Sequence, residues 1–164
     1  MSATALAPER LFDHADRMLR AARALCPSAT DADDLVQETF ARVLAQPREL
    51  RRGDEAGYLL RALRNTHISE HRARTRRPAR WSPTGEEIET ARDRGAGPEV
   101  VAHAHEVLGA IAQLPEPFRD AVVAVDVNGL SYAEAARALD VREGTIMSRV
   151  SRGRDRLARA LGAA

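Results

Sequence analysis

The stretch SYAEAARALDVREGTIMSRVSRGRDRLARAL, residues 131–161, decides the fold of this chain. Ser131, followed three residues later by Glu134, forms a capping box that predicts a helix beginning at Tyr132. Asp140 tolerates the left-handed backbone that a turn between helices needs, a position more often given to glycine. A second helix is predicted from an apolar stripe at three-to-four-residue spacing, Ile146, Val150, Leu157 and Leu161. Two short helices joined by a tight turn are how proteins present a helix to the DNA major groove.

The second predicted helix is rich in arginine. At about 100° per residue, one flank gathers Arg149, Arg152, Arg156 and Arg159. Residues 142–159 hold six arginines against two acidic residues, a local excess of four positive charges. Ordinary surface helices mix the two signs more evenly, so this segment favours nucleic-acid binding over a merely solvated face. Gly153 falls in the apolar stripe and is expected to weaken it slightly.

The composition limits the possible classes of protein. A chain of 164 residues, 44% hydrophobic and 30% charged, permits one ordinary domain or two small ones. No apolar run approaches the length of about 20 residues that crosses a bilayer, and the first ten residues lack the pattern of a signal peptide. We therefore expect a cytoplasmic protein without membrane insertion. The single cysteine, Cys26, cannot form an internal disulfide and is expected to be buried at a helix end.

The charge alternates along the chain. Residues 1–80 hold 15 arginines and 11 acidic residues, residues 81–106 hold 2 and 6, and residues 107–164 hold 8 and 7. The corresponding net charges are +4, −4 and +1. This alternation suggests two DNA-facing modules separated by an acidic connector.

The first module is predicted to contain three helices. The first ends near Pro27, which cannot continue a helix without cost. The second is capped by Thr30 or Asp31 and turns four apolar residues inward, Val36, Phe40, Val43 and Leu44. The third runs from about Ala56 into a basic sequence that ends at residue 77. Residues 78–100, with their glycines, prolines and acidic residues, form a linker, and four further helices follow.

Three segments, in order and spacing, resemble the bacterial extracytoplasmic-function (ECF) sigma factors of the sigma-70 family. They are DADDLVQETFARVLAQ (31–46), GYLLRALRNTHISEHRARTRR (57–77) and LPEPFRDAVVAVDVNGLSYAEAARALDVREGTIMSRVSRGRDRL (114–157). The resemblance implies an all-α fold of two small helical domains. A region 2-like domain would span residues 8–77 and a region 4-like helix-turn-helix domain residues 101–162, with a flexible linker over 78–100. It implies a protein that directs core RNA polymerase to particular promoters, with no enzymatic activity, cofactor or metal of its own.

The resemblance also implies a polymerase-binding surface. In that family the DDLVQETF helix docks on the coiled coil of the polymerase β′ subunit, and the β subunit is a further partner. Acid and amide groups are predicted on the solvent side of this helix, at Asp33, Asp34, Gln37 and Glu38. Such a face can pair with a basic partner helix. The alternative is a capped helix whose first turn carries ordinary acidic residues, favoured by the helix dipole.

A second implied surface reads the melted minus-ten promoter element. Asn65 aligns with the start of a short specificity loop in which a flipped base is captured, so the third helix is expected to break there. Asn65 alone could also be no more than a helix breaker. Single-strand readers combine a basic groove with groups that hold an unstacked base. The predicted contacts are Arg61, Arg64, Asn65, Thr66, His67, His71, Arg72, Arg74, Arg76 and Arg77.

The third implied surface binds duplex DNA at the minus-thirty-five element. Arginine there can grip guanine bidentately or clamp phosphate, and Met147 can touch a thymine methyl. The predicted contacts are Thr145, Met147, Ser148, Arg149, Ser151, Arg152 and Arg156. The Met-Ser-Arg and Arg-Gly-Arg details resemble the branch controlled by thiol-sensing zinc anti-sigma factors, so an anti-sigma factor is a further expected partner.

Two other functions compete with this interpretation. A stand-alone helix-turn-helix regulator would bind its site as a dimer, without polymerase. A small metal-dependent nuclease or deaminase would use the histidines, but no carboxylate or cysteine set completes a metal site beside His67, His71, His103 and His105.

Overall fold

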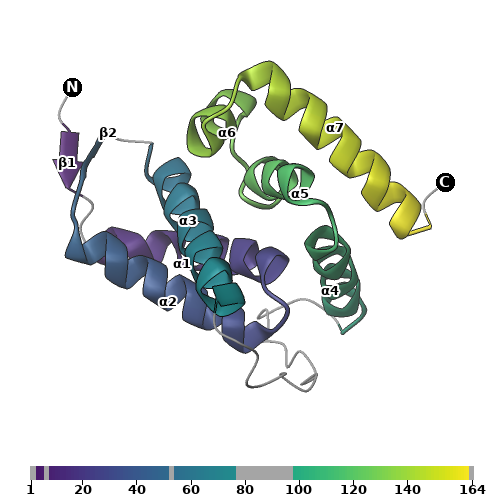
Figure 1. The fold of residues 1–164 in the computed structure, drawn as a ribbon, viewed down its shortest axis with the longest axis horizontal. Coiled ribbons are helices and arrows are strands. Elements are labelled where there is room, and N and C mark those ends of the chain that lie inside the picture. Colours follow the sequence, from purple (N-terminus) through teal and green to yellow (C-terminus); the bar gives the residue numbers. More distant parts are fainter. Residues whose placement is uncertain (1–2, 6–7, 52–53, 77–97, 163–164) are drawn as a thin grey trace.

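The computed structural model describes residues 3–5, 8–51, 54–76 and 98–162, and most of these residues are helical (Figure 1). Helices α1 (Pro8–Leu25), α2 (Ala29–Ala45) and α3 (Glu55–Arg76) pack into an N-terminal unit. The C-terminal unit contains α4 (Pro98–Ala112), α5 (Glu116–Val122), α6 (Tyr132–Leu139) and α7 (Glu143–Ala160), with a π-helical turn, η1 (Val123–Val127), continuing α5. The predicted all-α class and two helical domains are confirmed. Among the described residues, no helix is both long and apolar enough to cross a membrane.

Two short strands add to the helices. Strand β1 (Ala3–Ala5) pairs antiparallel with β2 (Glu49–Arg51), and Thr4 lies opposite Leu50. The pair joins the start of the chain to the connection between α2 and α3. Three-residue strands are too short to show an alternating pattern, so the sequence did not predict them.

The structure corrects two details of α2. Its N-cap is Ser28, whose extended backbone and hydroxyl, accepting from the Asp31 N–H at 3.1 Å, replace the predicted caps Thr30 and Asp31. Leu44 is 43% exposed and does not point inward as predicted. Val36 and Val43 are buried, since seven residues make almost two full turns, whereas Leu44 lies a further 100° around the helix.

Helix α3 is continuous, so the predicted break at Asn65 is wrong. One face of the helix is buried through Leu59, Leu63 and Thr66, at helical spacing. Asparagine costs at most about 0.7 kcal/mol in a helix interior, which this packing outweighs. Asn65 is therefore an exposed helical residue and does not begin a loop.

The helix-turn-helix forms as predicted. Ser131 and Glu134 make the full capping box, with the Ser131 N–H donating to the Glu134 carboxylate at 2.8 Å. These hydrogen bonds from Ser131 lower the pKa of Glu134. Asp140 ends α6 in the left-handed conformation, at φ 55° and ψ 50°.

Gly153, which we predicted to weaken the apolar stripe slightly, permits a close crossing of α7 and α5. A Cβ atom at this buried position would lie 2.6 Å from Val122 Cγ2 of α5. Real Cβ atoms do not approach other carbons so closely. The absence of a side chain at Gly153 therefore sets how near α7 lies to α5.

The two units pack against each other. Helix α3 contacts α6, and α1 contacts both α4 and η1. Leu25 and Leu60 of the first unit face Val123 and Leu139 of the second around a void of about 10 Å³, which is no more than one water molecule needs. The buried apolar residues of both units belong to one continuous cluster. The predicted linker lies mostly outside the described residues, and α4 begins at Pro98, before the predicted start at residue 101.

Candidate nucleic-acid and partner-binding surfaces

The outer face of α7 is open to solvent. Ile146 and Val150 are buried and fix the helix on the C-terminal unit. On the other side Met147 is 53% exposed, and Ser148, Ser151 and Arg152 are exposed as well. Arg149 and Thr145 are half-buried at the margins of this face. The structure thus brings most of the predicted minus-thirty-five residues onto one surface.

Two other arginines of α7 fasten the helix to its own unit. Arg154 donates through Nε and Nη2 to both carboxylate oxygens of Asp126, at 3.1 and 2.6 Å, and this bidentate pairing raises the pKa of Arg154. The guanidinium carbon of Arg156 lies 4.8 Å from the centre of the Phe118 ring, a cation–π contact. Arg156, predicted to contact DNA, is therefore engaged with α5.

The predicted minus-ten residues divide between two sides of α3. Arg61 and Asn65 line a hollow of about 270 Å³ between α2 and α3. A cavity of about 610 Å³ beside α5 is lined instead by Arg64, His67, His71 and Arg72, together with Cys26, which is buried as predicted. Thr66 lines the same hollow as Asn65 and is only 3% exposed. Arg74 and Arg76 belong to the end of α3, and Arg77 lies outside the described residues.

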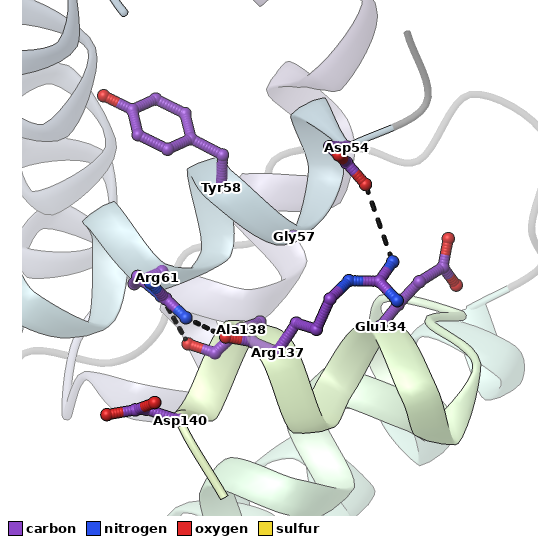
Figure 2. A pocket seen from close by; sticks show the side chains of 8 residues that line it. All are labelled: Asp54, Gly57, Tyr58, Arg61, Glu134, Arg137, Ala138 and Asp140. Carbon is purple, nitrogen blue, oxygen red and sulfur yellow. Dashed lines mark hydrogen bonds and ion pairs between the residues drawn. The ribbon is translucent and has the colours of Figure 1, made fainter. Parts of the chain in front are cut away.

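Arg61 caps the C-terminus of α6. Its Nε donates to the carbonyl oxygen of Ala138 at 2.9 Å, and its Nη2 donates to the carbonyl oxygen of Arg137 (Figure 2). Carbonyls in the last turn of a helix have no partner within the helix and carry its negative dipole end. A guanidinium from the other unit satisfies them here.

Arg64 faces α5. Its Nη2 lies 3.0 Å from Glu116 Oε1, and its Nε donates to the carboxylate of Asp120. Asp120 is only 7% exposed. Burial raises the pKa of this carboxyl, and the hydrogen bond and charge of Arg64 only partly offset that rise. The positive charge of Arg64 is thus directed at the C-terminal unit and away from solvent.

A cavity of about 440 Å³ lies at the contact between α3 and α6. Arg137 reaches across it, with Nη2 at 3.5 Å from Asp54 Oδ1, while the Tyr58 side chain points away from α6 (Figure 2). Gly57 lies so close to α6 that a Cβ atom built there would be 3.9 Å from Ala138 Cβ.

The predicted polymerase-binding residues share the outer side of α2. Asp33, Asp34, Gln37 and Glu38 are all exposed. Glu38 Oε1 accepts from Arg42 Nε at 2.7 Å, one helical turn away. Helix α2 packs on α1 and α3 through its other side.

Among the described residues, no group of three or more histidine, cysteine or acidic side chains is arranged to hold a metal ion.

Comparison with known proteins identifies the two units. The family model "Sigma-70 region 2" matches residues 11–77, and "Sigma-70, region 4" matches residues 104–157. The ECF RNA polymerase sigma factor EcfG of Rhodopseudomonas palustris is 36% identical over 84% of this chain and 75% of its own length. SigM of Mycobacterium tuberculosis is 37% identical over 94% of this chain and 76% of its own length. The chain belongs to the ECF sigma factors.

Further relatives agree with this assignment. SigE of Mycolicibacterium smegmatis is 36% identical over 91% of the present sigma factor, which spans 59% of that relative. A solved complex of the sigma factor RpoE with the anti-sigma factor NepR from Bartonella quintana matches the fold with a TM-score of 0.71 and 25% identity. The match covers 94% of this chain and 95% of that one. As a sigma factor, the protein directs RNA polymerase in promoter-specific transcription initiation.

Sequence reasoning missed the acidic side of the contact between regions 2 and 4. Glu116 and Asp120 lie 52 and 56 residues from Arg64, and Ala138 lies 77 residues from Arg61. No local pattern couples residues so far apart. The excess of arginine on α3 was visible, but the sequence did not indicate that region 4 supplies its partners.

Proposed function

We propose that α7 and α3 are the two promoter-reading elements of this sigma factor, within a region 2 domain of residues 8–77 and a region 4 domain of residues 101–162 joined by a linker over 78–100. Helix α7 would bind duplex DNA at the minus-thirty-five element, and the Asn65 hollow would bind the melted minus-ten strand. The observation that carries the proposal is the open face of α7. Arg152 is exposed there beside Met147 and Ser151, on a helix anchored through Ile146.

The face of α7 suits the major groove. Arg149 and Arg152 each offer a planar fork that matches the two acceptors of guanine or a backbone phosphate. Met147 offers an apolar contact for a thymine methyl, and Ser148 and Ser151 can donate to phosphate or base edges. The Arg154 pair with Asp126 supports this surface by holding α7 at a fixed angle to η1.

The hollow beside Asn65 suits a single strand. Its amide provides both a donor and an acceptor for a base edge. Arg48 lines the same hollow and is exposed, so its charge is available to a phosphate beside a captured base, whereas Arg42 on the same hollow is paired with Glu38 at 2.7 Å. We propose this capture by a helical Asn65, with the base entering between α2 and α3.

The partners follow from the remaining surfaces. The exposed acidic side of α2 would bind the coiled coil of the polymerase β′ subunit, and the β subunit would contribute further contacts. An anti-sigma factor is proposed because a relative of the same fold is known in complex with one; its thiol-sensing zinc type stays a prediction. Polymerase would form the phosphodiester bonds in the cytoplasm, and this chain would catalyse no reaction.

Run-off transcription with core polymerase tests the proposal. With Asn65→Ala we expect about a 10-fold loss of open complexes on duplex promoter, the effect of roughly 1.4 kcal/mol in base contacts, and a smaller loss on a template with a pre-melted bubble. Gln113→Ala removes an exposed amide outside this hollow, so it is the matched control and should retain activity. Equal loss on both templates would indicate base capture after melting. No loss on either would remove Asn65 from the site.

A further inference from the structure

We propose that the short strand β1 is a positioning element for the minus-ten site, because it fixes the wall of the Asn65 hollow that carries Arg48. Strand β1 lies beside β2, at the connection between α2 and α3 (Figure 1). Its residues, 3–5, precede residue 11, where the match to sigma-70 region 2 begins. The inference rests on the proposed function of the hollow. It adds that a segment outside both matched regions sets how firmly the melted strand is held.

The hollow has two walls. Helix α3 forms one wall and carries Asn65. The end of α2 and the connection after it form the other wall and carry Arg48, which is exposed. The two other arginines of the hollow are engaged, because Arg42 donates to Glu38 and Arg61 donates to the end of α6. Arg48 is therefore the arginine of this hollow that is best placed to bind a phosphate of the strand.

Helix α2 does not extend to Arg48. The helix ends at Ala45, and its C-cap, Gln46, has left the helical conformation at φ −133° and ψ 70°. The Gln46 N–H still donates to the Arg42 carbonyl oxygen, at 3.2 Å. Pro47 follows, and proline has no N–H with which to continue the helix. The backbone at Arg48 must therefore be fixed from its other side.

Strand pairing fixes that other side. Strand β2 begins at Glu49, directly after Arg48, and Ala5 lies opposite Glu49 in the antiparallel register. Hydrogen bonds between strands restrict the backbone of each paired residue. After β2, the Asp54 N–H donates to the Arg51 carbonyl oxygen at 3.0 Å, which joins the strand to the start of α3. The wall that carries Arg48 is thus held by β1 on one side and by α3 beyond it.

The strand pair is short, so its effect on the hollow is graded. Leu50 is half-buried and packs against the core, which gives β2 one anchor besides β1. Two paired strands of this kind are only marginally stable by themselves. Loss of β1 should leave the helices folded and free the wall to sample other conformations. A DNA strand that binds there would then have to order the wall, which weakens binding.

Deleting β1 tests the proposal. A chain without residues 2–5 is assembled with core polymerase, and its binding to a labelled single-stranded oligonucleotide carrying the minus-ten element is measured. We expect about 3- to 10-fold weaker binding, the usual effect of one hydrogen bond. Thr4→Pro, which disfavours the strand at full length, should cause a smaller loss. Thr4→Val, which favours a strand, is the matched control and should bind as the natural chain does.

Salt dependence distinguishes lost positioning of Arg48 from a general loss of structure. Each phosphate contact with a single strand contributes about 0.7 to the slope of log affinity against log salt concentration. Arg48→Ala should reduce the slope by about 0.7, and the deletion should reduce it by up to the same amount. Combining the deletion with Arg48→Ala should cause no further loss of affinity. Arg51→Ala removes an exposed arginine of β2 outside the hollow and should leave the slope unchanged.

The opposite results are equally specific. Natural affinity and slope in the deletion variant would overturn the proposal, and so would an undiminished effect of the deletion in the Arg48→Ala background. Circular dichroism checks that the helices are intact, and Thr4→Pro carries the same comparison if the deletion variant does not fold. If Arg48→Ala and Asn65→Ala both bind the oligonucleotide normally, the proposed function of the hollow fails, and this inference fails with it.

Discussion

Helices α7 and α3 both carry several arginines, yet the two helices use them differently. On α7, Arg154 pairs with Asp126, 28 residues away in the same region, and Arg152 remains exposed. On α3, Arg64 takes its partners from region 4, more than 50 residues away. The α7 surface is therefore complete whenever region 4 is folded, whereas the availability of the α3 surface depends on how the two regions are arranged.

Loss of Arg149 should give the largest effect on the α7 side of this comparison. Arg149→Ala removes a fork that can bind guanine or phosphate, so we expect recognition of the minus-thirty-five element to fall by about 10- to 100-fold, or 1–3 kcal/mol. Promoter binding by the holoenzyme measures the loss. Arg159→Ala is the control, because Arg159 donates to its own helix at the Asp155 carbonyl and lies near the end of α7. An equal fall in affinity for core polymerase would contradict the separate roles of the two regions.

Adding a side chain at Gly153 should weaken the packing of α7 on α5 and leave α3 unchanged. Gly153→Ala forces a methyl against Val122, which costs about 1–3 kcal/mol, while alanine returns about 1 kcal/mol of helix propensity. Urea unfolding should therefore show a net loss of stability between roughly zero and about 2 kcal/mol. Gly109→Ala, on α4 with open space around it, should be neutral or stabilising. Equal stability of the two variants would show that α5 and α7 can separate freely.

The contact of Arg156 with Phe118 sharpens the distinction between arginines that bind DNA and arginines that position α7. Arg156→Ala should lower the free energy of unfolding by about 0.5–1 kcal/mol, the usual strength of an exposed cation–π pair. Its effect on minus-thirty-five affinity should be smaller than that of Arg149→Ala. A larger effect on DNA than on stability would return Arg156 to the DNA-binding set.

The buried carboxyl of Asp120 predicts the smallest effect, a pH dependence on the α3 side. Its pKa is raised by burial, and the charged groups that face it are Arg64, Arg119 and Glu116. Stability from a raised acidic pKa is fully present below the ordinary value near 4 and is lost as the pH rises through the raised value. The unfolding free energy of the natural chain, measured relative to Asp120→Asn, should therefore decline over this window. An increase with pH would show that the Arg64 ion pair outweighs burial.

Local chemistry explains which features the sequence could predict. The capping box at Ser131 and the left-handed turn at Asp140 depend on neighbouring residues, and both appear as expected. The predicted break at Asn65 failed because burial of Leu63 and Thr66 stabilises helix where the residue's own preference is weak. The role of Gly153 depends on a partner helix, which no local pattern identifies.

The candidate binding surfaces could also be predicted from the sequence only where they depend on local pattern. The exposed residues of α7 and α2 follow from helical periodicity, because each helix has one apolar face that must be buried. The minus-ten set could not be resolved from periodicity alone. Residues 61 and 65 share one side of α3, and residues 64, 67 and 71 share another, but only the packing shows that α6 engages Arg61 and that α5 engages Arg64.

The distance between the two regions, measured in the free chain and in the promoter complex, tests the central claim most directly. Spin labels attached through Ala41→Cys on α2 and Ala160→Cys on α7, both exposed positions, in a chain that also carries Cys26→Ser, would report it. We predict a single distance within the roughly 40 Å diameter of a compact chain of this length when it is free, and an increase of tens of ångströms with polymerase and promoter. The same short distance in both states would contradict the account.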